Sequence, residues 1–124
     1  MPFRYGIATM TDVPQVILDA EFELGGARQH GFAADLLPPK WFTKDPARGL
    51  ADEIDEMLLV IRTALHLARD LRAPTAFAFW RELDAAQSAW GAARRLPPLL
   101  TTFGTSFVER ALLHALCRAH GVTL

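Results

Sequence analysis

The sequence has little cysteine and no surplus of charge of either sign. Its one cysteine, Cys117, cannot form an internal disulfide, which excludes a disulfide-stapled secreted scaffold and predicts a reducing, cytoplasmic location. The 13 Lys and Arg residues oppose 14 Asp and Glu residues, so the net charge of -1 provides no basic surface for nucleic acid or for an anionic membrane. We therefore expect neither of these partners.

Long apolar runs are also missing. No stretch approaches the roughly 20 apolar residues that span a bilayer, and the first residues lack the basic and apolar segments of a signal peptide. The sequence therefore predicts a soluble protein. Its 124 residues, of which 51% are hydrophobic, are enough for one domain with a core of its own.

Alternating apolar and polar residues predict an antiparallel sheet within about residues 1–37. In residues 13–24 one side of the strand is apolar, whereas the other carries Ile17 and three acidic residues, as expected of a strand with one wet face. Gly25 and Gly26 supply a tight turn, so residues 27–37 should return antiparallel. Residues 3–8 alternate as well and are predicted as a third, shorter strand.

From about residue 46 to residue 121 the apolar residues follow a helical period. Residues 50–71 predict a long helix, and residues 76–93 a second helix with Thr75 as its N-cap. A third helix is expected after Gly104, where Ser106 and Glu109 have the spacing of a capping box. The predicted fold class is α+β: a three-stranded antiparallel sheet followed by a bundle of three or more helices.

The sequence offers no catalytic constellation and no metal site. The acidic residues at the start of the first helix suit the positive end of the helix dipole, so we interpret them as structural: Asp52, Glu53, Asp55 and Glu56. His114, Cys117 and His120 have a spacing that resembles metal ligands. However, His120 is turned about 120° around the helix from His114, and no fourth ligand lies near in sequence.

Several large apolar side chains fall outside the predicted helical stripes. Each of them could fill the core of a small domain. Together with two proline-bearing loops, they favour a surface that another domain or subunit covers. They are Met10, Trp41, Phe42, Phe77, Phe79, Phe103 and Leu113.

Three motifs, MPFRYGIATMT, GFAADLLPPKWFTKDP and TSFVERALLHALCRAHG, resemble the N-terminal capping domain of the enolase superfamily, in its mandelate racemase and muconate lactonizing enzyme branch. The resemblance covers the whole chain, 1–124, as a single capping domain. It implies a (β/α)-barrel partner, C-terminal to this domain, that holds the magnesium ligands and the catalytic base for a lyase or isomerase acting on a carboxylate. The chain alone would then be catalytically silent and would need no cofactor.

The resemblance also implies two loops, residues 7–14 and 36–46, that close over the barrel mouth. Within them the expected substrate-facing residues are Thr9, Met10, Thr11, Lys40 and Trp41. Lys40 would meet an anionic substrate, and Trp41 would either face substrate or fill the domain interface. Family members commonly carry Asp at the position of His114. Because this chain has His there, the usual contact of that position to the barrel is not expected to be kept unchanged.

Two matters stay open at this point. The reaction could be that of a dehydratase, a racemase or a cycloisomerase, and the residues do not name the substrate. The alternative function is a stand-alone α+β interaction module that buries its exposed apolar face by self-association as a homodimer.

Overall fold

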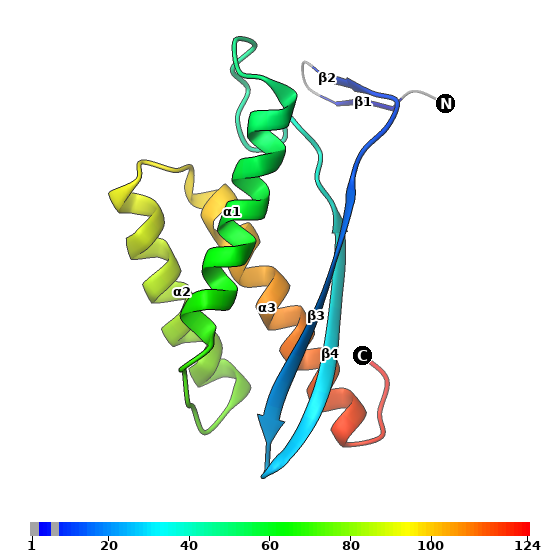
Figure 1. The fold of residues 1–124 in the computed structure, drawn as a ribbon, viewed down its shortest axis with the longest axis vertical. Coiled ribbons are helices and arrows are strands. Elements are labelled where there is room, and N and C mark those ends of the chain that lie inside the picture. The colour runs from blue at the N-terminus through cyan, green and yellow to red at the C-terminus, as the bar shows by residue number, and fades with distance from the viewer. Residues whose placement is uncertain (1–2, 6–7) are drawn as a thin grey trace.

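The fold is α+β, with the strands first in the sequence and the helices after them. The computed structural model describes residues 3–5 and 8–124 (Figure 1). None of the helices in these residues combines the length and the apolar composition needed to cross a membrane. The elements are β1 (Phe3–Tyr5), β2 (Ala8–Met10), β3 (Gln15–Leu24), β4 (Ala27–Leu36), α1 (Leu50–Ala68), α2 (Ala76–Ala93) and α3 (Pro98–Ala119).

Strands β3 and β4 form the predicted antiparallel hairpin. Their register runs from Gln15 opposite Leu36 to Leu24 opposite Ala27. Gly25 and Gly26 have φ angles of +60° and +83°, a conformation that glycine adopts without the steric cost of a Cβ atom. The predicted wet face is confirmed, because the Ile17 side of β3 is exposed while Leu18 is buried.

The predicted three-stranded sheet is wrong. Among residues 3–5 and 8–124, strand β1 pairs only with β2, and these residues form two separate two-stranded sheets. Thr9 and Met10, predicted as loop, belong with Ala8 to a second short strand, whereas Gly6 and Ile7 lie outside the described residues. The physical reason is that alternation predicts an extended segment but not the strand with which it pairs. Pairing of β1 with β2, which is near in sequence, costs less loop-closure entropy than pairing with the long hairpin.

The helices match the prediction except at two ends. The Thr75 hydroxyl accepts a hydrogen bond from the amide of Ala78 at 3.1 Å, which confirms the N-cap of α2. Helix α1 ends at Ala68 instead of residue 71. Helix α3 begins at Pro98, so Ser106 lies inside it and donates to the carbonyl of Phe103, and the predicted capping box is wrong. Proline is well suited to the first helical position because its φ is already helical.

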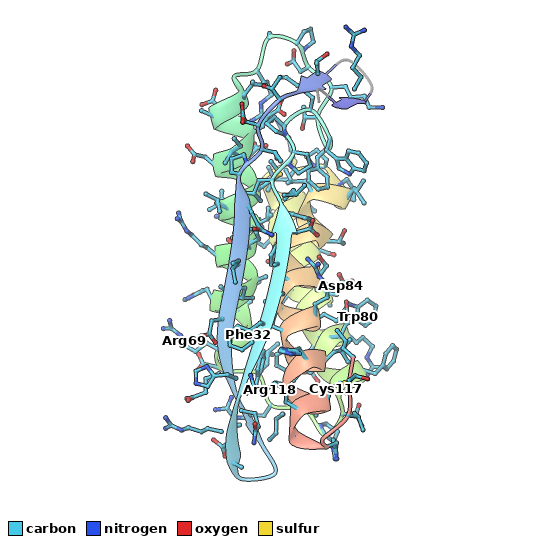
Figure 2. The ribbon with its side chains drawn as sticks, turned by 90° about the vertical axis from the view of Figure 1, so that its right-hand side faces the viewer. Phe32, Arg69, Trp80, Asp84, Cys117 and Arg118 are labelled. Atoms are coloured by element: carbon cyan, nitrogen blue, oxygen red, sulfur yellow. The ribbon has the colours of Figure 1, made fainter. Side chains whose placement is uncertain are left out.

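Helix α3 is the element on which the others pack. Its backbone lies close to both long strands and to both other helices, whereas in the described residues the backbones of α1 and α2 come this close only to each other and to α3. Side chains of α1 still share the core with those of the hairpin. Figure 1 shows α3 between the hairpin and α2, and in Figure 2, seen from the hairpin side, α1 and α3 lie behind the two strands on the left and on the right. The buried residues of α3 include Phe107, Val108, Ala111 and Ala115, each with no exposed surface.

Two glycines let the backbones around α3 approach closely. A Cβ atom on Gly31 of β4 would lie 1.8 Å from the carbonyl oxygen of Ala111 in α3. A Cβ atom on Gly104 of α3 would lie 2.2 Å from the carbonyl oxygen of Val60 in α1. Because both obstacles are backbone atoms, any larger residue would push α3 away from the hairpin or from α1.

We expect Gly104→Ala to destabilise the protein, although Ala is favoured over Gly within a helix by about 1 kcal/mol. The clash with Val60 should outweigh this gain and give a net loss of roughly 1–3 kcal/mol in the free energy of unfolding, measured by urea denaturation. Gly49→Ala is the control, because its new Cβ atom would meet only the movable carboxylate of Asp52. Equal effects of the two substitutions would contradict the close packing of α3 on α1.

Candidate functional site

The two loops implied by the resemblance lie at the same end of the molecule. The small β1–β2 hairpin and residues 37–49, which connect β4 to α1, are both at the top of Figure 1, and they are again at one end in the rotated view of Figure 2. The backbone amide of Leu37 donates to the carbonyl of Pro14 at 2.8 Å and extends the hairpin ladder toward this end. The fold therefore brings together two segments that are distant in sequence.

Lys40 is buried and fixes the second loop to the start of α1. Its ammonium donates to the Glu53 carboxylate at 2.8 Å and to the carbonyls of Asp45 and Arg48 at 2.8 and 2.6 Å. Its backbone amide donates to the same Glu53 carboxylate. The two side chains are only 8% and 6% exposed. Lys40 also has a φ of +67°, a strained conformation for a residue other than glycine, so these bonds must stabilise it.

Two further contacts hold the loop in place. The guanidinium of Arg48 forms a bidentate pair with Glu56, at 2.9 and 2.8 Å, and the hydrogen bonds to Glu56 raise the pKa of Arg48 above its usual value. Phe42 packs on Phe103 of α3 with ring centroids 5.1 Å apart, and Phe103 packs in turn on Phe107. The loop is therefore fixed to α1 by charge and to α3 by aromatic packing.

Trp41 lies between the two inward-facing residues Lys40 and Phe42. It is 52% exposed. Because both neighbours are fixed, the backbone of Trp41 loses little conformational freedom when another surface covers the ring. Trp41 is therefore the side chain of this loop that is best placed to contact a partner or a substrate.

The other predicted site residues lie on the first loop. Thr9 of β2 and Thr11 after it are exposed, and Met10 belongs to β2. Lys40 differs from these, because its ammonium already has three acceptors inside the protein. This position argues against the expected contact between Lys40 and an anionic substrate.

The structure gives two of the four clustered acidic residues specific partners. Glu53 pairs with Lys40 and Glu56 with Arg48, contacts that the helix-dipole interpretation did not foresee. A loop lysine followed within 15 residues by a first-turn glutamate was the only available signal. Among residues 3–5 and 8–124, no group of three His, Cys, Asp or Glu side chains is placed to hold a metal ion.

His114 contacts the hairpin. Its Nδ1 atom accepts a hydrogen bond from the backbone amide of Phe32 at 3.0 Å, and the two rings lie 5.6 Å apart. Arg110, one turn earlier, donates to the carbonyl of Ala34 at 3.1 Å. These side chains of α3 therefore close the free edge of β4, a role that the sequence did not indicate.

The predicted apolar docking surface is only partly present. Trp41, Phe77 and Leu113 are exposed, Phe77 by 67% and Leu113 by 37%. However, they belong to three separate elements: the loop before α1, the start of α2 and the far half of α3 (Figure 1). Phe79 and Phe103 pack against the buried core, and Phe42 does so too. Exposed apolar residues instead gather on the outer face of the hairpin, where Ile17, Phe32 and Leu36 lie.

The resemblance to the capping domain rests on the three sequence motifs. Comparisons of the chain with protein-family models, with curated proteins and with solved structures give no match. The α+β order of elements agrees with the resemblance at the level of fold class. The three-stranded sheet that it implies is not found in the described part of the chain.

We expect Lys40→Met to cost about 3–5 kcal/mol in the free energy of unfolding, because it leaves the buried Glu53 carboxylate without its cation. The matched control is the neighbouring Trp41→Ala, which removes an exposed ring and should cost no more than about 1 kcal/mol. Adding Glu53→Gln to Lys40→Met should recover part of the loss. Urea denaturation measures all three variants, and equal losses for Lys40→Met and Trp41→Ala would contradict the role of Lys40 in fixing the loop.

Proposed function

We propose that this chain is a substrate-specificity capping domain for a (β/α)-barrel of the enolase-superfamily type, in the mandelate racemase and muconate lactonizing enzyme branch. The observation that carries the proposal is the fixed loop at residues 37–49, which exposes Trp41 at the same end of the molecule as Thr9 and Thr11. A capping domain needs two such segments side by side to close one opening. Two of the three sequence motifs that suggested the family cover these segments, and the third covers helix α3.

In this proposal the loop acts as a preformed wall. The bonds of Lys40 and Arg48 to α1 set its shape before any substrate binds, so closure over a barrel would cost little ordering. Trp41 then covers the opening and excludes water, which strengthens the electrostatic interactions within. Lys40 acts through the loop as a positioning residue and does not touch substrate.

The chemistry would belong to the barrel. Barrels of this superfamily use magnesium to stabilise the enediolate formed when a proton is removed next to a carboxylate. The donor set of this chain does not fit that ion, since no three carboxylates converge among the described residues. In this proposal the catalytic base and the magnesium ligands come from the barrel.

The proposal predicts that the coding sequence adjoining this one encodes a barrel with a Lys-x-Lys motif and three carboxylates on successive strands. When the chain alone is incubated with magnesium and a carboxylate substrate in deuterated water, we expect no exchange of the proton at the α-carbon of the substrate. NMR measures this exchange. Exchange catalysed by the chain alone, or an adjoining frame without these residues, would refute the capping role.

In the two-domain protein, we expect Trp41→Ala to lower kcat/KM for the carboxylate by about tenfold or more, because the wall over the substrate is lost. Arg81→Ala provides the control, since Arg81 is exposed on α2. If both variants keep the activity of the parent protein, Trp41 does not take part in closure.

The alternative is a homodimeric interaction module. The outer face of the hairpin favours it, because Ile17, which is 68% exposed, is a same-face neighbour of Phe32 and Leu36 across the two strands. Sedimentation equilibrium distinguishes the two functions. The interaction module is favoured if the protein is a dimer, if Ile17→Ser dissociates that dimer and if Trp41→Ser leaves it intact.

A further inference from the structure

Strand β3 has an open edge. The backbone amide of Phe32 and the backbone carbonyl of Ala34 bond to side chains of α3. The backbone N–H and C=O groups of alternate residues of β4 therefore point away from β3. Directly opposite residues in an antiparallel pair share this property. The backbone groups of their partners therefore point outward along the other edge of the hairpin, and within the described residues they make no hydrogen bond. These partners are Ile17, Asp19, Glu21 and Glu23.

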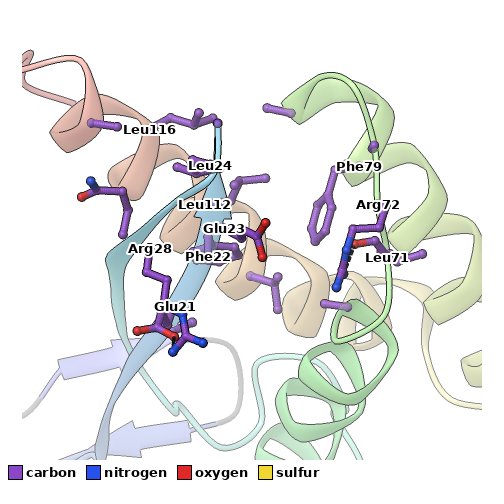
Figure 3. A pocket seen from close by; sticks show the side chains of 18 of the residues that line it. Glu21, Phe22, Glu23, Leu24, Arg28, Leu71, Arg72, Phe79, Leu112 and Leu116 are labelled. Atoms are coloured by element: carbon purple, nitrogen blue, oxygen red, sulfur yellow. Dashed lines mark hydrogen bonds and ion pairs between the residues drawn. The ribbon is translucent and has the colours of Figure 1, made fainter.

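A groove runs beside this edge. Its volume is about 850 Å³, and it separates β3 from the junction between α1 and α2. Figure 3 shows Phe22 and Leu112 on one side of the space, with Leu71 and Phe79 facing them from the other. An extended segment added to the edge of β3 would lie over this groove and could place every second side chain in it.

Three of the four residues with open backbone groups carry an acidic side chain on the outer face. Asp19 bonds to His30 at 2.8 Å, and Glu21 pairs with Arg28 at 3.2 Å. The carboxylate of Glu23 has no ion pair among the described residues. On the opposite wall, the guanidinium of Arg72 donates to the carbonyls of Arg69 and Leu71, so its charge is directed at the backbone. The outer face of the edge therefore favours a cationic partner.

We propose that the edge of β3 binds an extended segment of a partner protein in which basic and apolar residues alternate. The segment adds a third, antiparallel strand to the hairpin. Its basic residues lie opposite Asp19, Glu21 and Glu23, and its apolar residues enter the groove. This site is at the far end of β3 from the loop that carries Trp41, so it does not depend on the capping role.

A second copy of the chain fits this edge poorly. Two β3 strands paired antiparallel about a two-fold axis would bring their acidic residues opposite one another, and like charges in that position are destabilising. Charge complementarity therefore selects a different chain, one with Lys or Arg at alternate positions.

The probe is a synthetic peptide of roughly nine residues, the length of an ordinary strand, in which Lys and Val alternate. In antiparallel pairing, the amides that bond to β3 belong to the residues on the outer face, which are the lysines. N-methylation of the Lys amides should therefore abolish binding measured by calorimetry, whereas N-methylation of the Val amides should preserve it. The amide NMR signals of Asp19 and Glu21 should shift when the peptide binds.

A charge exchange provides the second arm. Glu21→Lys/Glu23→Lys should weaken binding of the Lys-Val peptide by about tenfold and should allow binding of a Glu-Val peptide. The matched control is Asp55→Lys/Glu82→Lys, which changes the net charge equally on exposed positions of α1 and α2 and should leave both affinities unchanged.

Three results would overturn the proposal. The first is equal binding of the two N-methylated peptides, which would mean that no strand is added. The second is equal weakening by the charge exchange and its control, which would mean that only net charge matters. The third is a shift of the Asp19 and Glu21 signals with protein concentration alone, which would assign the edge to a second copy.

Discussion

The packing of α3 against β4 is the constraint on which the rest of the structure depends. Gly31 permits it, because no Cβ atom stands between the strand and the carbonyl of Ala111. His114 and Arg110 then bond to the outer edge of β4. A two-stranded sheet has two edges, and a helix that covers one of them leaves the other open. The exposed edge of β3 and the groove beside it follow from this one-sided cover.

The same helix sets the position of the loop that carries Trp41. Gly104 lets α1 approach α3, and the first turns of α1 then place Glu53 under the loop. The buried pair between Lys40 and Glu53 is costly to desolvate, and its ammonium is fully bonded. Such a pair gives little net stability, but it defines a single loop conformation. The packing of α1 on α3 thus stabilises the fold, whereas the pair between Lys40 and Glu53 sets the position of Trp41.

Patterns that depend on neighbours in sequence were predictable, and contacts that depend on packing were not. Gly25 and Gly26 marked the turn, and Thr75 marked the start of α2. Gly104 was interpreted as a boundary, although it lies inside α3 to permit the approach of Val60. Lys40 was predicted to meet an anionic substrate, since its partner Glu53 stood in an acidic cluster that the helix dipole already explained. Each error concerns a residue whose role is set by a distant segment.

Amide hydrogen exchange of the unliganded chain, measured by NMR, tests most directly whether α3 closes one edge and the loop is fixed. We expect the amides of Phe32 and Lys40, which donate to His114 and Glu53, to exchange at least about tenfold more slowly than the amide of Asp19. Asp19 lies directly opposite Phe32 in the hairpin, so local strand stability is matched between them. Exchange of Lys40 as fast as that of Asp19, or of Asp19 as slow as that of Phe32, would contradict the account.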